Sequence, residues 1–340
     1  MCFLMRNQGK TYNDIGRQKS MKELSLEEIR NVTFGALHIE QTAEGICFYR
    51  CTDQQMAVWA SQNRVYRDRA ESAAGIRLDF HTDAQNLALT VSHPGKYEVC
   101  INGLLRAQYQ LQAGDSFALP LDDPLGHPPP EKRVTVCFPC HQRAVLTSVR
   151  LDHCAGLIPH TYRFRMLYIG DSITQGWETA FDSLSYAWRV ARHFDADIVN
   201  QGIGGTYYFE EAFDRIPFAP DVVIASYGTN DFGHWSTKEE LTAHCSAHLS
   251  LIAETYAGKY IFVITPIWRD RRNGQKLGSF EECRAIIAGQ AEKLGLTVID
   301  GLSLVPPLPA FFSDGYLHPN DCGMSLYAEN LICSLEKYIK

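Results

Sequence analysis

The sequence lacks any long apolar run, and it also lacks an excess of positive charge. No apolar stretch in its 340 residues approaches the roughly 18 residues that a helix needs to cross a bilayer. The chain carries 32 Lys and Arg against 39 Asp and Glu, for a formal net charge of -7. This balance argues against a nucleic acid or an acidic membrane as a partner. The hydrophobic content of 45% is ordinary for a soluble globular protein.

The eleven cysteines form no repeating framework, and their number is odd. Such a set suits reduced thiols in a cytoplasm. Cys137 and Cys140 form a CxxC pair, but no second pair accompanies them. Two buried thiols are therefore a better interpretation than a metal or redox site. The start of the chain, residues 1–6, is too short and too quickly polar for a signal peptide. We expect a cytoplasmic protein.

The first part of the chain predicts an extension and then a β-rich domain. Residues 1–31 are expected to be an N-terminal extension with a short helix over 26–31, because Ser25 and Glu28 have the spacing of a capping box. Residues 32–151 carry short alternating or β-branched runs separated by turn signals, with a hairpin turn at Asn102-Gly103 and a loop at 124–130. The expected strands are 76–80, 87–91, 97–101, 134–138 and 144–149. This texture predicts an antiparallel β-sandwich.

In residues 152–340 strands alternate with helices instead. Capping boxes at Thr237 and Ser279 each open a helix, and a last helix is expected over 323–338. The expected strands are 166–169, 197–200, 222–227, 260–265 and 296–299. Five βα units in succession predict an α/β domain with a parallel sheet between two layers of helices.

Polar residues follow the ends of these strands or lie in the last loop. Ser172 follows the first strand, Gly205 and Asn230 follow the second and third, and Asp314 and His318 precede the final helix. Taken alone, each has an ordinary explanation as a turn, a cap or a surface side chain. Together they can supply a nucleophile, a base, a group that orients the base, and donors for an oxyanion. We therefore predict acyl-transfer chemistry.

The stretches around these residues resemble the sequence blocks of the SGNH (GDSL-type) hydrolases, a family of serine esterases with a flavodoxin-like core. The resemblance covers roughly residues 165–340. It implies that Ser172 in Gly-Asp-Ser-Ile-Thr is the nucleophile and that its own N–H helps the oxyanion hole. It likewise implies that Gly205 and Asn230 complete the oxyanion hole and that His318 in His-Pro-Asn is the general base.

One spacing departs from the family pattern. The family's acid usually precedes its histidine by three residues, whereas Asp314 precedes His318 by four. In some similar carbohydrate esterases a backbone carbonyl replaces the acid. We predict that the Asp314 carboxylate orients His318, with a backbone carbonyl as the alternative.

The order of a β-rich domain followed by this core is similar to that of carbohydrate esterases with an N-terminal jelly-roll domain. Trp177, Trp235 and Trp268 follow presumed active-site strands, where their rings could stack on a sugar or simply pack loops onto the core.

The resemblance implies a serine esterase that removes an acetyl or other short acyl group from a carbohydrate or similar small polar substrate, with no metal or organic cofactor. A lipid-directed, aryl- or thioesterase on the same core is the alternative within enzymes. A carbohydrate-binding protein with a degenerate core is the alternative outside them. Binding alone, however, would not need a nucleophile. The oligomeric state is not predicted.

Overall fold

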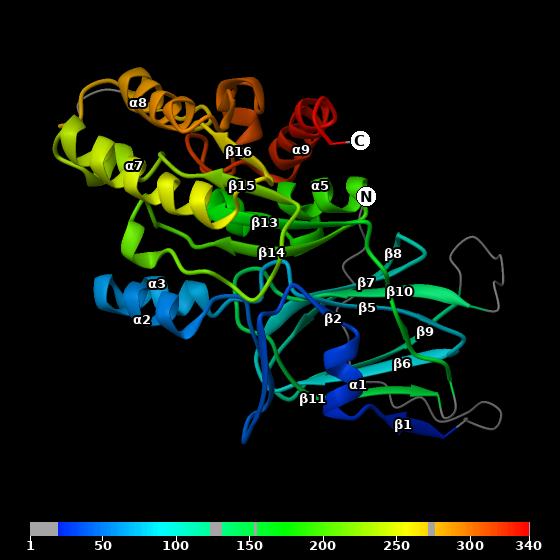
Figure 1. Cartoon of the computed structure of the whole chain (residues 1–340). Coiled ribbons are helices and arrows are strands. Elements are labelled where there is room, and N and C mark those ends of the chain that lie inside the picture. Colours follow the sequence, from blue (N-terminus) through cyan, green and yellow to red (C-terminus); the bar gives the residue numbers. More distant parts are fainter. Residues whose placement is uncertain (1–19, 123–130, 153–154, 271–275, 340) are drawn as a thin grey trace.

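The structure is a computed structural model that describes residues 20–122, 131–152, 155–270 and 276–339. It contains two antiparallel sheets, formed by the first part of the chain, and one parallel sheet, formed by the rest. Figure 1 shows the antiparallel strands in the lower part of the molecule and the parallel sheet with its helices above them. Residues 1–19 of the expected extension and the expected loop at 124–130 lie outside the described residues.

The two antiparallel sheets enclose one hydrophobic core, as a sandwich does. The first sheet consists of β1 (Met21–Glu23), β3 (His38–Thr42), β4 (Gly45–Tyr49), β6 (Asn86–Val91), β9 (Ser116–Pro120) and β11 (Val145–Asp152). The second consists of β2 (Thr33–Phe34), β5 (Arg77–Thr82), β7 (Gly95–Ile101), β8 (Leu104–Leu111), β10 (Lys132–Cys137) and β12 (Ile158–Pro159). Alternate residues such as Leu87, Leu89 and Val91 of β6 are buried in this core, which is the period of a strand with one inward face. Asn102 and Gly103 join β7 to β8 with positive φ angles of 51° and 76°, as a tight hairpin turn requires.

The β-rich region extends slightly beyond the residues expected for it and contains helices that we did not expect. β1 pairs with β11 and β12 pairs with β5, although β1 and β12 lie outside residues 32–151. The division at residues 31 and 151 stays a prediction. α1 (Leu26–Asn31) begins with the expected capping box. The unexpected helices are α2 (Asp53–Gln62) and α3 (Arg64–Ala70).

The sequence signal for α2 was a capping box formed by Thr52 and Gln55, both halves of which are present in the structure. Hydrophobic periodicity could not reveal this helix, because Gln55 and Trp59 are the only residues of α2 that are buried. α3 follows at once, capped by the side chain of Asn63.

The parallel sheet has the strand order β14-β13-β15-β16-β17, which is the 2-1-3-4-5 order of flavodoxin-like folds. All five strands lie where the sequence predicts them. They are β13 (Phe164–Gly170), β14 (Ala196–Gly202), β15 (Val222–Ser226), β16 (Tyr260–Ile264) and β17 (Thr297–Ile299). The chain leaves β13 toward β14 on one side and then returns to β15 on the other. Ligands bind outside the carboxyl ends of strands at such a reversal.

Helices cover both faces of this sheet, and alternate residues of β13 point to opposite faces. Met166 and Tyr168 belong to the core with α5 (Tyr186–Phe194) and α9 (Asp321–Leu335). Leu167 and Ile169 belong to the core with α7 (Lys238–Thr255) and α8 (Phe280–Lys293). The shorter helices are α4 (Ser172–Gln175), α6 (Asp231–His234), η1 (Asp182–Leu184), η2 (Glu210–Ala212), η3 (Gly301–Ser303) and η4 (Pro309–Phe311). Among the described residues, no helix combines the length and the apolar character that a membrane crossing requires.

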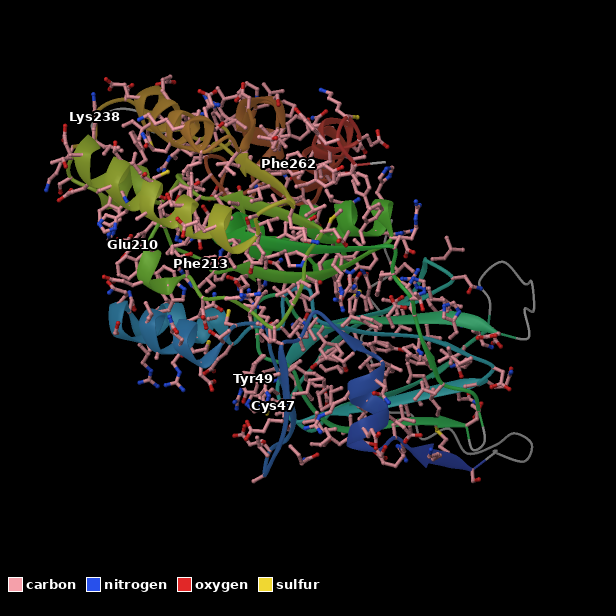
Figure 2. All side chains as sticks on the ribbon, in the orientation of Figure 1. Cys47, Tyr49, Glu210, Phe213, Lys238 and Phe262 are labelled. Carbon is pink, nitrogen blue, oxygen red and sulfur yellow. The ribbon has the colours of Figure 1, made fainter. Side chains whose placement is uncertain are left out.

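The segment after β14 passes between the helices of the β-rich region and α7. Glu210 on this segment pairs with His244 of α7 at 2.7 Å, and the Phe213 ring lies 5.9 Å from that of His248. Figure 2 shows Glu210 and Phe213 on this segment, below the yellow helix α7 and above the blue helices. The start of the same segment carries Gly205, and so α2 and α3 lie beside a predicted part of the site.

Candidate active site

Ser172 is held at the carboxyl edge of the parallel sheet by the turn between β13 and α4. β13 ends at Gly170, where an added Cβ would lie 2.3 Å from the Thr174 hydroxyl and 2.6 Å from the Ser226 carbonyl oxygen. A side chain at residue 170 would therefore push the turn apart. Asp171 caps α4 by accepting a hydrogen bond from the Ile173 N–H at 2.9 Å. Ser172 is then the first residue of the helix, and no acceptor within α4 lies in reach of its N–H.

Ser172, His318 and Asp314 form a continuous chain of hydrogen bonds. The Ser172 hydroxyl lies 2.9 Å from Nε2 of His318. Nδ1 of the same ring lies 2.8 Å from the Asp314 carboxylate. The loop closes on itself because the Ser313 N–H donates to the His318 carbonyl at 2.9 Å, and Gly315 bends it with a φ of +75°. The unusual spacing of four residues thus still brings the carboxylate to the imidazole, in the position that a backbone carbonyl would take in the alternative.

The Asp314 carboxylate is also fixed by the backbone of its own loop. One of its oxygens accepts hydrogen bonds from the N–H groups of Tyr316, Leu317 and His318 at 3.0, 2.7 and 3.1 Å. Burial works against the charged form, but the hydrogen bonds from Tyr316, Leu317 and the His318 ring outweigh it and hold the pKa of Asp314 below its ordinary value. The group facing the imidazole is therefore a carboxylate anion at neutral pH.

The turn after β14 presents Gly205 beside the end of β13. The Ile203 N–H donates to the Gly170 carbonyl at 2.8 Å, which ties this turn to the strand that leads to Ser172. Gly205 has a φ of +88°, a conformation that side chains disfavour. Within the described part of the chain, no acceptor is recorded for its N–H. An N–H without a partner at this edge is available to a ligand.

Asn230 lies next to the same turn, at the end of the third strand. Its side-chain amide donates to the Thr206 carbonyl at 2.9 Å. This bond uses one of the two amide hydrogens and fixes the orientation of the other. Thr206 directly follows Gly205, and so the two predicted oxyanion donors belong to adjacent, hydrogen-bonded segments.

Asn230→Ala should lower kcat for an activated ester about a hundredfold, with little change in KM. The reason is that a donor to the developing oxyanion contributes roughly 3 kcal/mol to the transition state and little to the ground state. Steady-state kinetics measures the effects on kcat and KM separately, and circular dichroism checks the fold. An Asn230→Ala variant with unchanged kcat would remove this side chain from the oxyanion hole.

The turn that carries Gly205 is held by two long polar side chains that sequence reasoning missed. Gln175 accepts from the Gly204 N–H at 2.8 Å, and its amide donates to the Ser72 hydroxyl and the Cys140 carbonyl, both at 3.0 Å. Arg50 is fully buried and donates to the Gly202 carbonyl at 2.8 Å. No local motif marks either residue, because every one of these partners is distant in the sequence.

Arg50 has further partners, all of them oxygen atoms of neutral groups. Its guanidinium also donates to the carbonyl and the hydroxyl of Ser72, and to the carbonyls of Asn200 and Arg69. Burial lowers the pKa of Arg50, but a guanidinium stays charged at physiological pH. The β-rich region thereby fixes the end of β14, from which the oxyanion turn begins.

Of the three predicted substrate-binding tryptophans, Trp177 lies against a side chain that bonds to the oxyanion turn. The Arg69 guanidinium lies 4.8 Å from the centre of its ring, and that side chain also donates to the Gly204 carbonyl at 2.6 Å. Trp235 stacks on His244 at 4.1 Å and donates its indole N–H to Asp231. Trp268 packs against Phe312 at 4.9 Å. Stacking of these rings on a sugar stays a prediction.

Two buried carboxyl groups lie beside the catalytic residues in the sequence. Burial raises the pKa of Asp171 to about 7, and its proximity to Asp231 adds to this effect. Burial likewise raises the pKa of Asp231 to about 6, although hydrogen bonds from Trp235 and Tyr208 oppose the shift. One oxygen of Asp231 is buried without a hydrogen-bond partner among the described residues. Both groups therefore keep their protons to a higher pH in the folded protein than in the unfolded chain.

The contribution of these two groups to the free energy of unfolding should consequently fall as pH rises from about 4 to about 7. In this window the unfolded chain has already released protons that the folded protein still holds. Each pH unit can therefore lower the free energy of unfolding by up to about 1.4 kcal/mol per group. Asp231→Asn should therefore become more stable relative to the wild type as pH rises through this window. Denaturant unfolding at several pH values measures the difference in free energy of unfolding between the variant and the wild type. Asp68→Asn, on the exposed face of α3, is the control. A difference that stays constant with pH would contradict the expectation.

The CxxC pair consists of buried thiols. Cys137 ends β10, and burial raises the pKa of both thiols. Among the described residues, no group of three or more His, Cys, Asp or Glu side chains is placed to hold a metal ion. A hollow of about 450 Å³ lies between β7, β8, α5 and α9, lined by residues such as Gln108, Arg189 and Glu329, and it includes none of the predicted catalytic residues.

Both the sequence and the fold are similar to those of known proteins. Residues 168–326 match the GDSL-like lipase/acylhydrolase family. The chain therefore contains a GDSL-like lipase/acylhydrolase domain. This domain is a hydrolase domain of the SGNH family. No curated protein matches the chain significantly over its sequence.

Solved structures share the fold of both regions. A salicylyl-acyltransferase from a tetracycline biosynthetic pathway superimposes with a TM-score of 0.81 at 19% identity, over 95% of this chain and 99% of the other. A family two carbohydrate esterase from Cellvibrio japonicus gives a TM-score of 0.64 at 15% identity, over 94% and 98%. Another, from Clostridium thermocellum in complex with cellohexaose, gives 0.61 at 14% identity, over 89% and 98%. The pairing of a strand-rich region with a GDSL-like domain is therefore a shared architecture.

Proposed function

We propose that the protein is a serine esterase that works through an acyl-enzyme formed on Ser172. The observation that carries the proposal is the chain of hydrogen bonds from the Ser172 hydroxyl through His318 to Asp314, with steps of 2.9 and 2.8 Å. Such a chain lets the imidazole accept the serine proton while the carboxylate stabilises the imidazolium that forms.

In the first half of the reaction, the Ser172 oxygen attacks the ester carbonyl and Nε2 of His318 takes the hydroxyl proton. The carbonyl π electrons move onto oxygen, and the N–H groups of Ser172 and Gly205 and the Asn230 amide donate to that oxyanion. The intermediate collapses, the bond to the alcohol breaks, and His318 returns its proton to the leaving oxygen. In the second half, His318 activates a water that releases the acid from Ser172.

The proposed substrate carries an acetyl or another short acyl group on a carbohydrate or similar small polar alcohol. Support comes from the two-region architecture, which carbohydrate esterases of family two share, and from Trp177, whose ring lies against the Arg69 side chain that bonds to the oxyanion turn. The oligosaccharide seen in one of those complexes belongs to that protein. A lipid-directed, aryl- or thioesterase is the alternative.

An esterase panel tests the proposal. Release of nitrophenolate from p-nitrophenyl acetate by the wild type, and its loss in Ser172→Ala, would support the enzyme class. Acetylated sugars and p-nitrophenyl esters of increasing chain length then rank the substrates. Faster hydrolysis of long-chain esters than of acetyl esters would favour the lipid-directed alternative. No hydrolysis of any ester would favour a non-catalytic carbohydrate-binding protein.

Acyl transfer to an alcohol is a second candidate, favoured by the similarity to the salicylyl-acyltransferase over both full chains. An alcohol that enters the site in place of water would take the acyl group from Ser172 by the same steps. Adding alcohols or sugars to the p-nitrophenyl acetate reaction distinguishes the two. New esters among the products indicate transfer, whereas acetate alone indicates hydrolysis.

A further inference from the structure

Two side chains of α3 contact the glycine of the predicted oxyanion hole. A Cβ added at Gly205 would lie 2.9 Å from Nη1 of Arg69 and 2.9 Å from a ring carbon of Tyr66. These residues stand three apart on the helix, and so their side chains share one face. The β-rich region thus contributes a cation and a phenol to the edge of the site.

Most of the hydrogen-bonding capacity of Arg69 is unused. A guanidinium has five N–H hydrogens, and one bond is recorded here, from Nη1 to the Gly204 carbonyl at 2.6 Å. Among the residues that the structure describes, no carboxylate lies within ion-pair distance of Arg69, and no hydrogen-bond acceptor is recorded for the Tyr66 hydroxyl. The remaining N–H hydrogens of this half-buried guanidinium are open to a ligand, and a cation without a counter-ion favours an anionic one.

Arg69 is also held in place before any ligand binds. Its guanidinium lies over the Trp177 ring at 4.8 Å, and its backbone carbonyl accepts from the buried Arg50 at 2.8 Å. Arg67 on the same helix offers a contrast. Its side chain is exposed, and its charge is paired with Glu71 at 3.2 Å. A fixed guanidinium with open donors can bind a carboxylate or a phosphate through paired hydrogen bonds.

We propose that Arg69 and Tyr66 form a binding site for an anionic group, a carboxylate or a phosphate, on the substrate. The anion would lie beside the oxyanion turn, close to the scissile ester. This assignment rests on the proposed esterase function and narrows its substrate to an acylated molecule that carries a negative charge. Arg69 would then determine specificity by adding affinity for anionic esters that neutral esters lack.

The competing explanation is that Arg69 only positions the oxyanion turn through the Gly204 carbonyl. The two roles differ in kinetics. Loss of an anion site raises KM for anionic esters and removes their advantage over neutral esters. Loss of turn positioning lowers kcat for all esters alike.

The test compares pairs of esters, one member neutral and the other carrying an anionic group. The acyl-side pair is mono-4-nitrophenyl succinate and its methyl ester. The alcohol-side pairs are 4-acetoxybenzoate with its methyl ester, and 4-acetoxyphenyl phosphate with phenyl acetate. Each pair is measured for the wild type, Arg69→Gln, Arg69→Lys, Tyr66→Phe and the control Arg67→Gln, after thermal unfolding has shown that each variant is folded.

For at least one pair, the wild type should favour the anionic ester in kcat/KM by about tenfold or more, as expected for hydrogen bonds to a charged group. Arg69→Gln should abolish this preference through KM, Arg69→Lys should retain part of it, and Arg67→Gln should retain all of it. Tyr66→Phe should reduce the preference. No preference in any pair, a preference that survives Arg69→Gln, or an equal loss of kcat for both members would overturn the proposal. Absence of hydrolysis of every ester, neutral and anionic, by the wild type would instead refute the esterase function itself.

Discussion

Ser172→Ala should lower kcat for p-nitrophenyl acetate by several orders of magnitude while the protein keeps its fold. The variant retains the oxyanion donors and the substrate site but has no oxygen to form the acyl-enzyme, and so only the residual effect of binding and the oxyanion hole should persist. The Ser172 hydroxyl lies 2.9 Å from Nε2 of His318, which prepares it for attack.

Covalent labelling checks the same assignment independently. A fluorophosphonate probe should modify Ser172 in the wild type, and peptide mapping should find no label in Ser172→Ala. Ser236→Ala, which removes an exposed hydroxyl near α6, serves as the control and should keep both activity and labelling. Labelling at another serine, with Ser172→Ala still active, would contradict the assignment.

The second large effect is expected from Asp314→Asn, which should lower kcat by a factor on the order of 10³ to 10⁴. The asparagine can still accept the backbone hydrogen bonds from Tyr316, Leu317 and His318 through its oxygen, and so the loop should persist. It cannot stabilise the imidazolium, and its amide can force the imidazole into the tautomer that leaves Nε2 unable to accept the serine proton.

The measurement is kcat against pH for the wild type and Asp314→Asn, with Asp321→Asn as the control. Asp321 accepts a hydrogen bond from the Ala180 N–H at 3.0 Å at the start of α9 and does not contact His318 in the recorded bonds. A loss of only a few fold in Asp314→Asn would mean that another group orients the ring. The working unit would then be a dyad of Ser172 and His318.

The strands and most helices of the GDSL-like domain were predictable because they depend on local patterns. A buried parallel strand is a short apolar run, as in Met166–Ile169. The starts of helices α7 and α8 are predicted by capping boxes at Thr237 and Ser279. The sandwich was predictable because apolar and polar residues alternate along its strands, as they do in a strand with one face toward the core. α2 and α3 were missed because their buried residues are too few to produce a periodic pattern.

The residues predicted for the site follow the same logic. Ser172, Gly205 and Asn230 each follow a strand of one parallel sheet, and parallel strands bring their carboxyl ends to one edge. The spacing between Asp314 and His318 left the orienting group open. The conformation of the loop around Gly315 places the carboxylate beside Nδ1, and sequence spacing alone cannot specify that conformation.

The sequence by itself determined the order of the strands along the chain and the residue types that acyl transfer requires, because both can be recognised from short local patterns. Only the tertiary structure placed Arg50, Gln175 and Arg69 around the oxyanion turn. Arg50 meets the Gly202 carbonyl across 152 positions of the chain, and Arg69 meets the Gly204 carbonyl across 135. Hydrogen bonds to backbone carbonyls leave no trace in the sequence of the partner, since every residue offers the same carbonyl. The contribution of the β-rich region to the site therefore became visible only when the two regions were seen packed together.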